Sequence, residues 1–228
     1  MNVGKPIRIG IAICCYKGHI GLLKRLFDSI ERQTRKPNEV IVSCSSSEWQ
    51  DIPYRRDMYS FPFQIITHTE KKNAAQNRNY AAAQLTTDVV CFFDADDIMH
   101  PRRIEIIADC FHTHPRLMLF LHNIEFSSSS EFPPIQQTYL YMNQLTRCDW
   151  GSTILNPPIH HANIANGHAS IRRSVLQYVQ FHETVEFQGK EDTAFSTDII
   201  QLYPQQTAYC YNILSRYEPS GTGGWQCA

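Results

Sequence analysis

The sequence predicts an α/β fold in which a mostly parallel central sheet is flanked by helices. In the first half of the chain, short apolar segments typical of strands alternate with segments that have the apolar spacing of helices. This alternation favours parallel strands joined by crossover helices. Of the 228 residues, 43% are hydrophobic, which is enough for one large buried core.

The first four elements are expected at residues 7–13, 23–30, 39–42 and 63–67. Isoleucines alternate with Arg, Gly and Ala over residues 7–13, which is the period-two pattern of a strand. Over residues 23–30 the apolar side chains recur at i, i+3, i+4 and i+7, so this segment is predicted to be a helix with one buried face. Residues 39–42 and 63–67 are short apolar runs, predicted to be strands.

Four more elements complete the alternating part of the sequence. Residues 73–84 are rich in Ala and free of Pro, which predicts a helix, and residues 88–93 form a short apolar strand. Pro101 can occupy the first turn of a third helix, which extends to about residue 111. Residues 116–122 are predicted to be a further strand.

The regular rhythm breaks after residue 123. Two proline pairs, at 133–134 and 157–158, punctuate an irregular stretch, and a helical pattern resumes only near Glu191. We therefore predict a single domain over residues 1–228. Its parts are a half that binds one ligand at about 1–123, a half that binds or orients another at about 124–215, and a flexible tail at 216–228.

Polar residues follow three of the predicted strands, at the point where each strand ends. These segments are Cys14–Tyr16, Ser43–Ser47 and Asp94–Asp97. Ligands of parallel sheets bind beyond the carboxyl ends of the strands. The three segments are therefore the first candidates for a ligand site.

The segment Asp94-Ala-Asp-Asp97 is the sharpest local feature of the sequence. Its three carboxylates repel one another and raise each other's pKa unless a cation neutralises them. Hard divalent cations such as Mg²⁺ and Mn²⁺ prefer carboxylate oxygens and often bridge to substrate phosphates. The pattern therefore predicts a metal site, while a solvated turn in which Asp97 caps the following helix is the structural alternative.

Two further segments carry charged side chains that are candidates for contact with a ligand. Lys71, Lys72 and Arg78 place positive charge near a predicted helix start, where unpaired N–H groups also favour anions such as phosphate. Glu191 and Asp192 open the later helix, and a carboxylate there could act as general base for a hydroxyl nucleophile. The alternatives are a solvated helix start in the first case and helix capping in the second.

Composition narrows the class of protein and its compartment. The formal net charge of −1 argues against a general nucleic-acid binder. The eight cysteines include no Cys-x-x-Cys pair, so a chain with reduced thiols in the cytoplasm is expected. The apolar runs are shorter than the roughly 20 residues of a membrane-spanning helix, and the N-terminal segment lacks a signal-peptide pattern. Peripheral membrane association and the oligomeric state stay open.

Taken in order along the chain, these motifs resemble the inverting glycosyltransferases of family 2, which have the GT-A fold. The resemblance extends from Ile7 to about Leu202. It includes the opening strand, helix and second strand, the blocks Asn73–Asn79 and Thr87–Asp97, and the segments Gly167–Arg173 and Glu191-Asp192. It implies a Rossmann-like nucleotide-binding half followed by an acceptor-binding half within one GT-A domain.

The resemblance implies roles for individual residues on the donor side. The donor would be a nucleoside diphosphate sugar, with a UDP-sugar as the first expectation, held together with Mn²⁺ or Mg²⁺. Asp96 would bind the divalent cation, and Asp94 would contact the metal or the ribose. The other residues expected to contact the donor are Cys14, Tyr16 and Ser45 at the base and Lys72, Gln76 and Arg78 at the diphosphate and sugar.

On the acceptor side, the resemblance implies that Asp192 removes the proton of the attacking hydroxyl of a glycan or other acceptor, with Glu191 as the second choice. His168 and Trp150 are weaker candidates for acceptor contacts. The implied activity is metal-dependent sugar transfer with inversion at the anomeric carbon. Two alternatives stay open: a nucleotidyltransferase acting on a sugar phosphate, and a non-catalytic carbohydrate-binding GT-A domain, which the serines of Ser43–Ser47 keep in consideration.

Overall fold

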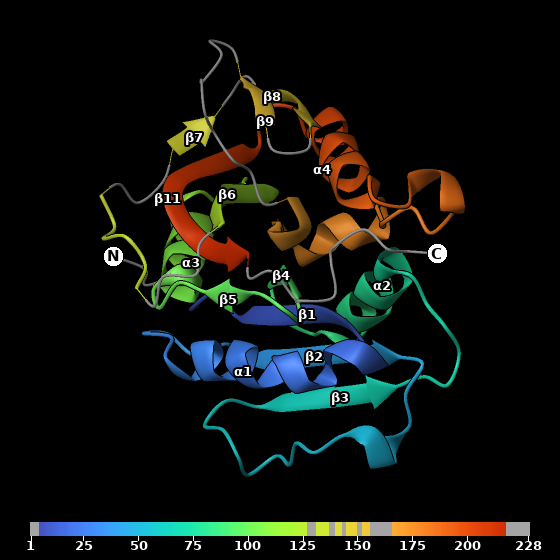
Figure 1. Cartoon of the computed structure of the whole chain (residues 1–228). Helices are drawn as coiled ribbons and strands as arrows, with labels where there is room; N and C mark the ends of the chain where they lie inside the picture. The colour runs from blue at the N-terminus through green and yellow to red at the C-terminus, as the bar shows by residue number, and fades with distance from the viewer. Residues whose placement is uncertain are drawn as a thin grey trace.

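The computed structural model describes residues 5–126, 131–136, 140–142, 145–149, 152–155 and 166–217. Among these residues, four α-helices and a nine-stranded sheet form the framework (Figure 1). The helices are α1 (Leu23–Glu31), α2 (Ala74–Gln84), α3 (Arg103–Thr113) and α4 (Glu191–Leu202). The strands of the main sheet are β1 (Ile9–Tyr16), β2 (Glu39–Ser45), β3 (Phe63–Thr67), β4 (Val89–Asp94), β5 (Ile98–Met99), β6 (Leu119–Phe126), β7 (Leu140–Met142), β10 (Ser170–Arg172) and β11 (Thr207–Tyr217). A separate two-stranded sheet pairs β8 (Leu145–Asp149) with β9 (Ser152–Leu155).

The central sheet is mostly parallel, as the sequence predicts. Its strand order is β3-β2-β1-β4-β10-β6-β11-β5, and β7 pairs with β11 beside this path. β1 is parallel to β2 and β4, β2 is parallel to β3, and β6 is parallel to β11. β10 runs antiparallel between β4 and β6, so this short strand joins two parallel blocks into one sheet.

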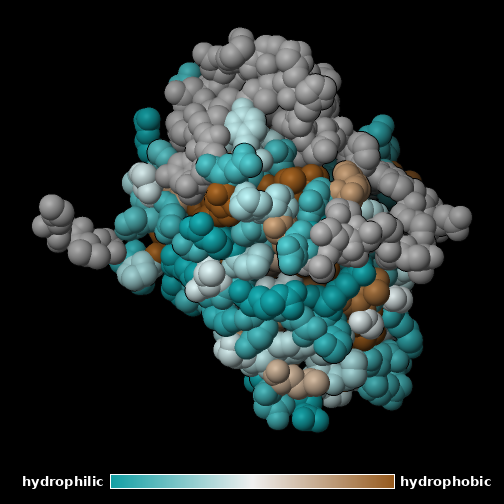
Figure 2. All heavy atoms as spheres, turned by 60° about the vertical axis from the view of Figure 1, so that its left-hand side comes forward, coloured by the Kyte–Doolittle hydropathy of each residue, from teal (hydrophilic) through white to brown (hydrophobic). Residues whose placement is uncertain are grey.

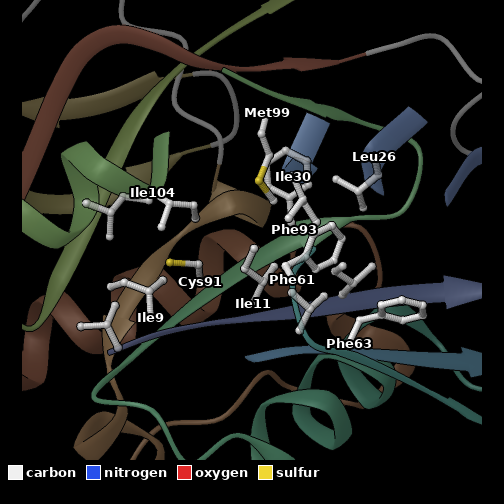
Figure 3. Close-up of a cluster of buried hydrophobic side chains, with 14 of the residues drawn as sticks. Ile9, Ile11, Leu26, Ile30, Phe61, Phe63, Cys91, Phe93, Met99 and Ile104 are labelled. Carbon is white, nitrogen blue, oxygen red and sulfur yellow. The ribbon is translucent and has the colours of Figure 1, made fainter. Parts of the chain in front are cut away.

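Two hydrophobic layers cover the faces of the sheet. On one face, α1 and α3 pack against β1 and β4, with Leu26, Ile11 and Phe93 among the fully buried residues (Figure 3). On the other face, α2 and α4 pack against the alternate side chains of the same strands, among them Phe92, which contacts Phe195 of α4. β4 is a continuous apolar run in the sequence because both of its faces are buried.

The later part of the chain departs from the sequence-based expectations. The expected boundary at residues 123 and 124 falls inside β6, and the start predicted for the flexible tail is wrong because β11 continues to Tyr217. Arg216 is buried within this strand and pairs with Glu125 at 2.5 Å. Residues 218–228 lie outside the described part. Sequence patterning also does not indicate β10 or β11 as strands.

The surface of the described residues is largely polar. Figure 2 shows a face dominated by hydrophilic side chains, on which hydrophobic ones appear in small groups. The large exposed hydrophobic residues, such as Trp49 and Val185, come from different parts of the chain. No helix among the described residues is both long enough and apolar enough to cross a membrane.

Candidate functional site

The carboxyl ends of β1, β2 and β4 lie side by side, because the three strands are adjacent and parallel. Tyr16 at the end of β1 is in register with Ser45 of β2, and Cys14 is in register with Asp94 of β4. The three strand ends singled out in the sequence therefore meet at one edge of the sheet. This edge is where parallel sheets bind their ligands.

Asp94, the last residue of β4, is held by two donors on one oxygen. Its Oδ1 accepts a hydrogen bond from Cys14 Sγ at 3.0 Å and another from Arg78 Nη2 at 2.7 Å. Burial alone would raise the pKa of Asp94, but the Arg78 charge and other partners outweigh burial, and the pKa is lowered. The carboxylate is therefore ionised at neutral pH. Its Oδ2 faces His168, at 3.8 Å from Nε2.

Arg78 connects three elements of the fold. It belongs to α2, pairs with Asp94 at the end of β4, and donates through Nη1 to Glu191 Oε1 of α4 at 2.7 Å. Its guanidinium also lies over the Phe181 ring, 5.3 Å from the centroid, and only 5% of the side chain is exposed. A guanidinium suits this bridging role because its N–H donors lie in one plane and point in several directions.

Asp192 directly follows Glu191 but has different partners. Its Oδ1 accepts the backbone N–H of Thr193 at 2.7 Å. Burial is the main reason that the pKa of Asp192 is raised, although the positive charge of Arg78 opposes this effect. A carboxylate with a raised pKa is a stronger base than an ordinary exposed one. Asp192 therefore has the property that a general base needs.

Gly167 marks the space that these charged groups share. A Cβ added at this residue would lie 3.2 Å from Arg78 Nη2, 3.2 Å from Asp94 Oδ2 and 3.7 Å from Asp192 Oδ2. Carboxylates from the two halves of the chain therefore approach the same point. The backbone of the 3₁₀ helix η3 (Asn166–His168) can lie this close to them because residue 167 has no side chain.

His168 and Asp97 form a buried pair next to Asp94. His168 Nε2 lies 2.9 Å from Asp97 Oδ2, and the two side chains are 3% and 2% exposed. The imidazole stacks on Phe93, with 4.0 Å between the ring centroids. Burial raises the pKa of Asp97 to about 6, and His168 opposes this rise. The acceptor contact predicted for His168 stays a prediction, and the burial of this side chain argues against it.

The sequence-based alternative for Asp97, a cap on the following helix, is wrong. α3 begins at Arg103, and the residue in the N-cap position is Arg102, which makes no side-chain cap. The Asp97 carboxylate instead faces His168, in the segment just before β10. In the sequence, Asp97 stands out only as a member of the Asp94–Asp97 cluster. The cluster does not reveal its partner His168, which lies far along the chain.

The acidic groups at this edge fit a hard divalent cation. Asp94, Asp97 and His168 each offer a ligand atom, and these atoms lie within 4.8 Å of one another. The pKa of Asp96 is raised by burial and by the nearby charge of Asp94, and His19 Nδ1 lies 3.9 Å from Asp96 Oδ2. A cation beside Asp96 and Asp94 would relieve the repulsion between the two carboxylates.

The serine-rich end of β2 is tied to the protein itself. Ser43 Oγ donates to Asn77 Oδ1 at 2.8 Å, and Asn77 Nδ2 donates to Ser45 Oγ at 3.2 Å. Ser45 is buried, and its hydroxyl also donates to the Lys72 carbonyl at 3.3 Å. These bonds fix the end of β2 against the start of α2. A base contact by Ser45 remains a prediction, one that its buried position does not favour.

The other predicted donor contacts lie around the same edge. Tyr16 is 42% exposed, and its ring lies against His19 with 4.3 Å between the centroids. Lys72 is partly exposed just before α2. Gln76 and Asn73 exchange hydrogen bonds in a capping box at the start of α2, so the Gln76 side chain is held by the helix end. Trp150 lies outside the described residues.

Two asparagines that the sequence did not single out individually fasten the second half of the chain to α2. Asn79 Nδ2 donates to the Phe181 carbonyl, and Asn79 Oδ1 accepts the Phe181 N–H, both at 2.9 Å. Asn73 Nδ2 donates to the Glu183 carbonyl at 2.8 Å. The segment that leads into α4 is thereby positioned on α2. Both residues lie in the Asn-rich block 73–79, but only the fold brings residues 181–183 next to it.

The fold and the site together define a class of protein. A GT-A α/β sheet carries, at the carboxyl ends of its strands, acidic groups suited to a cation, an arginine bridge and a separate carboxylate with a raised pKa. This combination is the one that the resemblance to family 2 glycosyltransferases implies. The profile of glycosyl transferase family 2 matches residues 10–179, and the chain belongs to this family.

Solved glycosyltransferase structures have the same fold. S. aureus TarS 1–349 aligns with a TM-score of 0.70 at 16% identity, over 93% of this chain and 60% of that one. The complex of TarS 1–349 with UDP-GlcNAc aligns with a TM-score of 0.65 at 15% identity, over 93% of this chain and 58% of that one. A mannosyltransferase from Pyrobaculum calidifontis in complex with GDP-Man and Mn²⁺ gives 0.54 at 18% identity, over 90% and 57%.

Curated relatives carry the same general description. An uncharacterized glycosyltransferase of Haemophilus influenzae is 28% identical over 97 residues, which are 42% of this chain and 32% of that protein. The uncharacterized glycosyltransferase YwdF of Bacillus subtilis is 25% identical over 141 residues, which are 59% of this chain and 50% of that protein. The matched region therefore spans half or less of the length of each relative.

Proposed function

We propose that this chain is a metal-dependent inverting glycosyltransferase that moves a sugar from a nucleoside diphosphate sugar to a hydroxyl group of a glycan or other acceptor. The observation that carries the proposal is the approach of Asp94, Arg78 and Asp192 to one point beside Gly167. A sugar bound next to this point would have a donor-side carboxylate and a candidate general base within reach. A nucleotidyltransferase would use the nucleotide site proposed at the carboxyl ends of β1, β2 and β4, but it would leave Asp192 without a role.

Solved relatives and the residues at the carboxyl ends of β1 and β4 support a nucleoside diphosphate sugar as the substrate. TarS has been solved with UDP and with UDP-GlcNAc, and the Pyrobaculum mannosyltransferase with GDP-Man and Mn²⁺. We take a UDP-sugar as the first candidate, with Tyr16, exposed at the end of β1, stacking on the base. Asp94 and Asp96 would hold the cation, which when bound neutralises charge on the departing diphosphate.

In this proposal Asp192 accepts the proton of the acceptor hydroxyl. The acceptor oxygen forms a bond to the anomeric carbon while the bond from that carbon to the diphosphate oxygen breaks, and the electron pair leaves with the nucleoside diphosphate. Attack from the face opposite the leaving group inverts the anomeric configuration. Glu191, already paired with Arg78, acts as a positioning residue that fixes the start of α4.

The first test measures donor use and its dependence on metal. The protein is mixed with Mn²⁺ and a panel of UDP- and GDP-sugars, and binding is measured by calorimetry and turnover by release of nucleoside diphosphate. We expect one nucleotide class to bind, and Asp96→Asn to lose Mn²⁺-dependent affinity by at least about tenfold. Asp57→Asn, the same change at an exposed loop position, is the matched control. The proposal fails if no donor binds, or if Asp96→Asn responds to Mn²⁺ as the wild type does.

The second test separates the two carboxylates at the start of α4. Asp192→Asn keeps the shape of the side chain but removes the base, so we expect kcat to fall by roughly 10²- to 10⁴-fold while donor affinity is retained. Glu191→Gln weakens the ion pair with Arg78, so we expect a lower melting temperature and a smaller loss of kcat. The reverse pattern would assign the base to Glu191.

The pH dependence of kcat in the wild type is a third test, and it also concerns Asp192. A general base works only when it is deprotonated, so kcat should fall as the pH decreases through the pKa of Asp192. Because burial raises this pKa, the acid limb should lie above the pH at which an ordinary aspartate titrates. Initial rates measured between pH 4 and 8 check this expectation, and a flat profile over the acid range would exclude Asp192 as the base.

A further inference from the structure

Cys15 and Cys44 face each other across two neighbouring strands. They are in register on the parallel strands β1 and β2, so their side chains lie on the same face of the sheet. Both belong to the same buried cluster, with exposures of 4% and 0%. Neighbouring strands lie roughly 4.8 Å apart, and disulfides span Cα separations of roughly 4.4–6.8 Å. The two backbones are therefore already at a separation that a disulfide can bridge.

We propose that Cys15 and Cys44 form a site of reversible oxidation, at which hydrogen peroxide converts the two thiols into a disulfide between β1 and β2. The Cys44 sulfur attacks one peroxide oxygen, the O–O bond breaks, and Cys44 becomes a sulfenic acid as hydroxide leaves. The Cys15 sulfur then attacks the Cys44 sulfur, the S–O bond breaks, and water leaves. Two thiols and one peroxide give one disulfide and two waters, so the two electrons lost by sulfur are gained by the peroxide oxygens.

Cys44 is the better nucleophile of the two. The neighbouring Cys15 thiol lowers the pKa of Cys44 to about 7, although burial opposes this effect. Because the thiolate is the reactive form, Cys44 can start the reaction near neutral pH. Burial raises the pKa of Cys110 and of Cys210, which lie near each other elsewhere in the core, so these two thiols stay protonated. The pair on β1 and β2 is therefore expected to oxidise first.

The neighbouring Cys14 offers an internal comparison. Side chains alternate along a strand, so Cys14 points to the opposite face of β1 from Cys15. Its thiol donates to Asp94 at 3.0 Å, and burial raises its pKa well above the usual value. It lacks the partner that Cys15 has across the strand pair, since its in-register neighbours are Ser43 and Asp94. The inference concerns thiol chemistry and does not depend on the proposed function.

The experiment detects the cross-link directly. The reduced chain is treated with hydrogen peroxide, remaining thiols are alkylated under denaturing conditions, and tryptic peptides are analysed by mass spectrometry before and after dithiothreitol. We expect the peptide of residues 9–17 to be joined to the peptide that contains Cys44, and dithiothreitol to separate them. Because the first peptide contains both Cys14 and Cys15, fragmentation spectra of the wild type localise the bond without any substitution.

Variants then assign the two partners. The cross-link should persist in Cys14→Ser and in Cys110→Ser, and it should disappear in Cys15→Ser and in Cys44→Ser. The inference is overturned if both peptides remain fully alkylated after peroxide treatment, or if Cys44 is oxidised to a sulfinic acid without cross-linking. It is equally overturned if the wild-type spectra place the bond on Cys14, or if Cys110 and Cys210 cross-link in preference to this pair.

Discussion

Gly167 lies where Arg78, Asp94 and Asp192 converge, so one added methyl group there tests the site at the scale of a single residue. A Cβ at 3.2 Å from Arg78 Nη2 and from Asp94 Oδ2 is closer than ordinary van der Waals contact. We expect Gly167→Ala to displace these groups and to lower kcat by roughly 10- to 100-fold. Transfer kinetics measure this loss, and circular dichroism checks that the variant is folded.

Gly21→Ala is the matched control for this substitution. A Cβ at Gly21 would have no neighbour within 4 Å, so we expect its kcat to equal that of the wild type. Full activity in Gly167→Ala, or an equal loss in both variants, would show that the space beside Gly167 is not used.

The charged residues of the site could be predicted from the sequence, but most of their partners could not. Asp94, Arg78 and Asp192 belong to motifs with recognisable composition and order. The ion pair between Arg78 and Glu191 joins residues 113 positions apart, and local patterns do not encode such a pairing. Cys14 illustrates the difference: the sequence predicts a base contact, whereas the structure shows its thiol donating to Asp94.

At the scale of elements, α3 begins with an imidazole as its hydrogen-bond acceptor. His100 Nδ1 accepts the backbone N–H of Arg102 at 3.0 Å, just before the first residue of the helix. Burial lowers the pKa of His100 to about 4, and the charge of Arg102 adds to this effect. The folded protein therefore keeps His100 neutral at pH values where the unfolded chain, with a pKa of roughly 6.5, binds a proton.

Acidification should therefore destabilise the fold through His100. Because the pKa of His100 is lower in the folded state, His100 contributes stability at pH values above its pKa in the unfolded chain. This contribution is lost as the pH falls toward 4. The amide oxygen of His100→Asn can accept the same N–H. Between pH 7.5 and pH 5, the free energy of unfolding of this variant should fall by about 2 kcal/mol less than that of the wild type. Urea denaturation at the two pH values gives this difference, with His112→Asn, an exposed position on α3, as the control. Equal pH dependence in His100→Asn and the wild type would refute the role of His100.

The elements that the sequence predicted are those with a clear local signal, either a periodicity or a continuous apolar or Ala-rich run. α1 and β4 have apolar patterns that match their burial, and both are found where they are expected. β10 has only three residues, too few for a period to be visible. β11 contains buried polar residues, which obscure an apolar strand pattern, and they are tolerated because they find partners: Ser215 contacts His122, and Arg216 pairs with Glu125.

At the scale of the whole molecule, Arg78 ties the two halves of the chain together. Removing its guanidinium would leave Asp94 and Glu191 largely buried without their cation. We expect Arg78→Met to lower the free energy of unfolding by about 3–5 kcal/mol. Arg78→Lys keeps the positive charge but cannot form both hydrogen bonds. Its free energy of unfolding should therefore lie between those of the wild type and Arg78→Met. Urea denaturation measures the series, with the exposed Arg173→Met as control. An Arg78→Met variant as stable as the wild type would mean that the bridge contributes little.

The position of β10 between β4 and β6 has a consequence for how the protein is made. During synthesis, β1 to β6 leave the ribosome well before residues 166–172 do, because chains emerge from the N-terminus. Until then β4 and β6 have no strand between them, Asp97 has no His168, and no backbone lies beside Asp94 at the position of Gly167. The insertion of β10 therefore joins β6 to β4 and brings Gly167 and His168 to the acidic cluster, and α4 adds Asp192 afterwards. A nascent chain that stops short of this strand carries the acidic cluster of β4 but not the space in which the cluster would act.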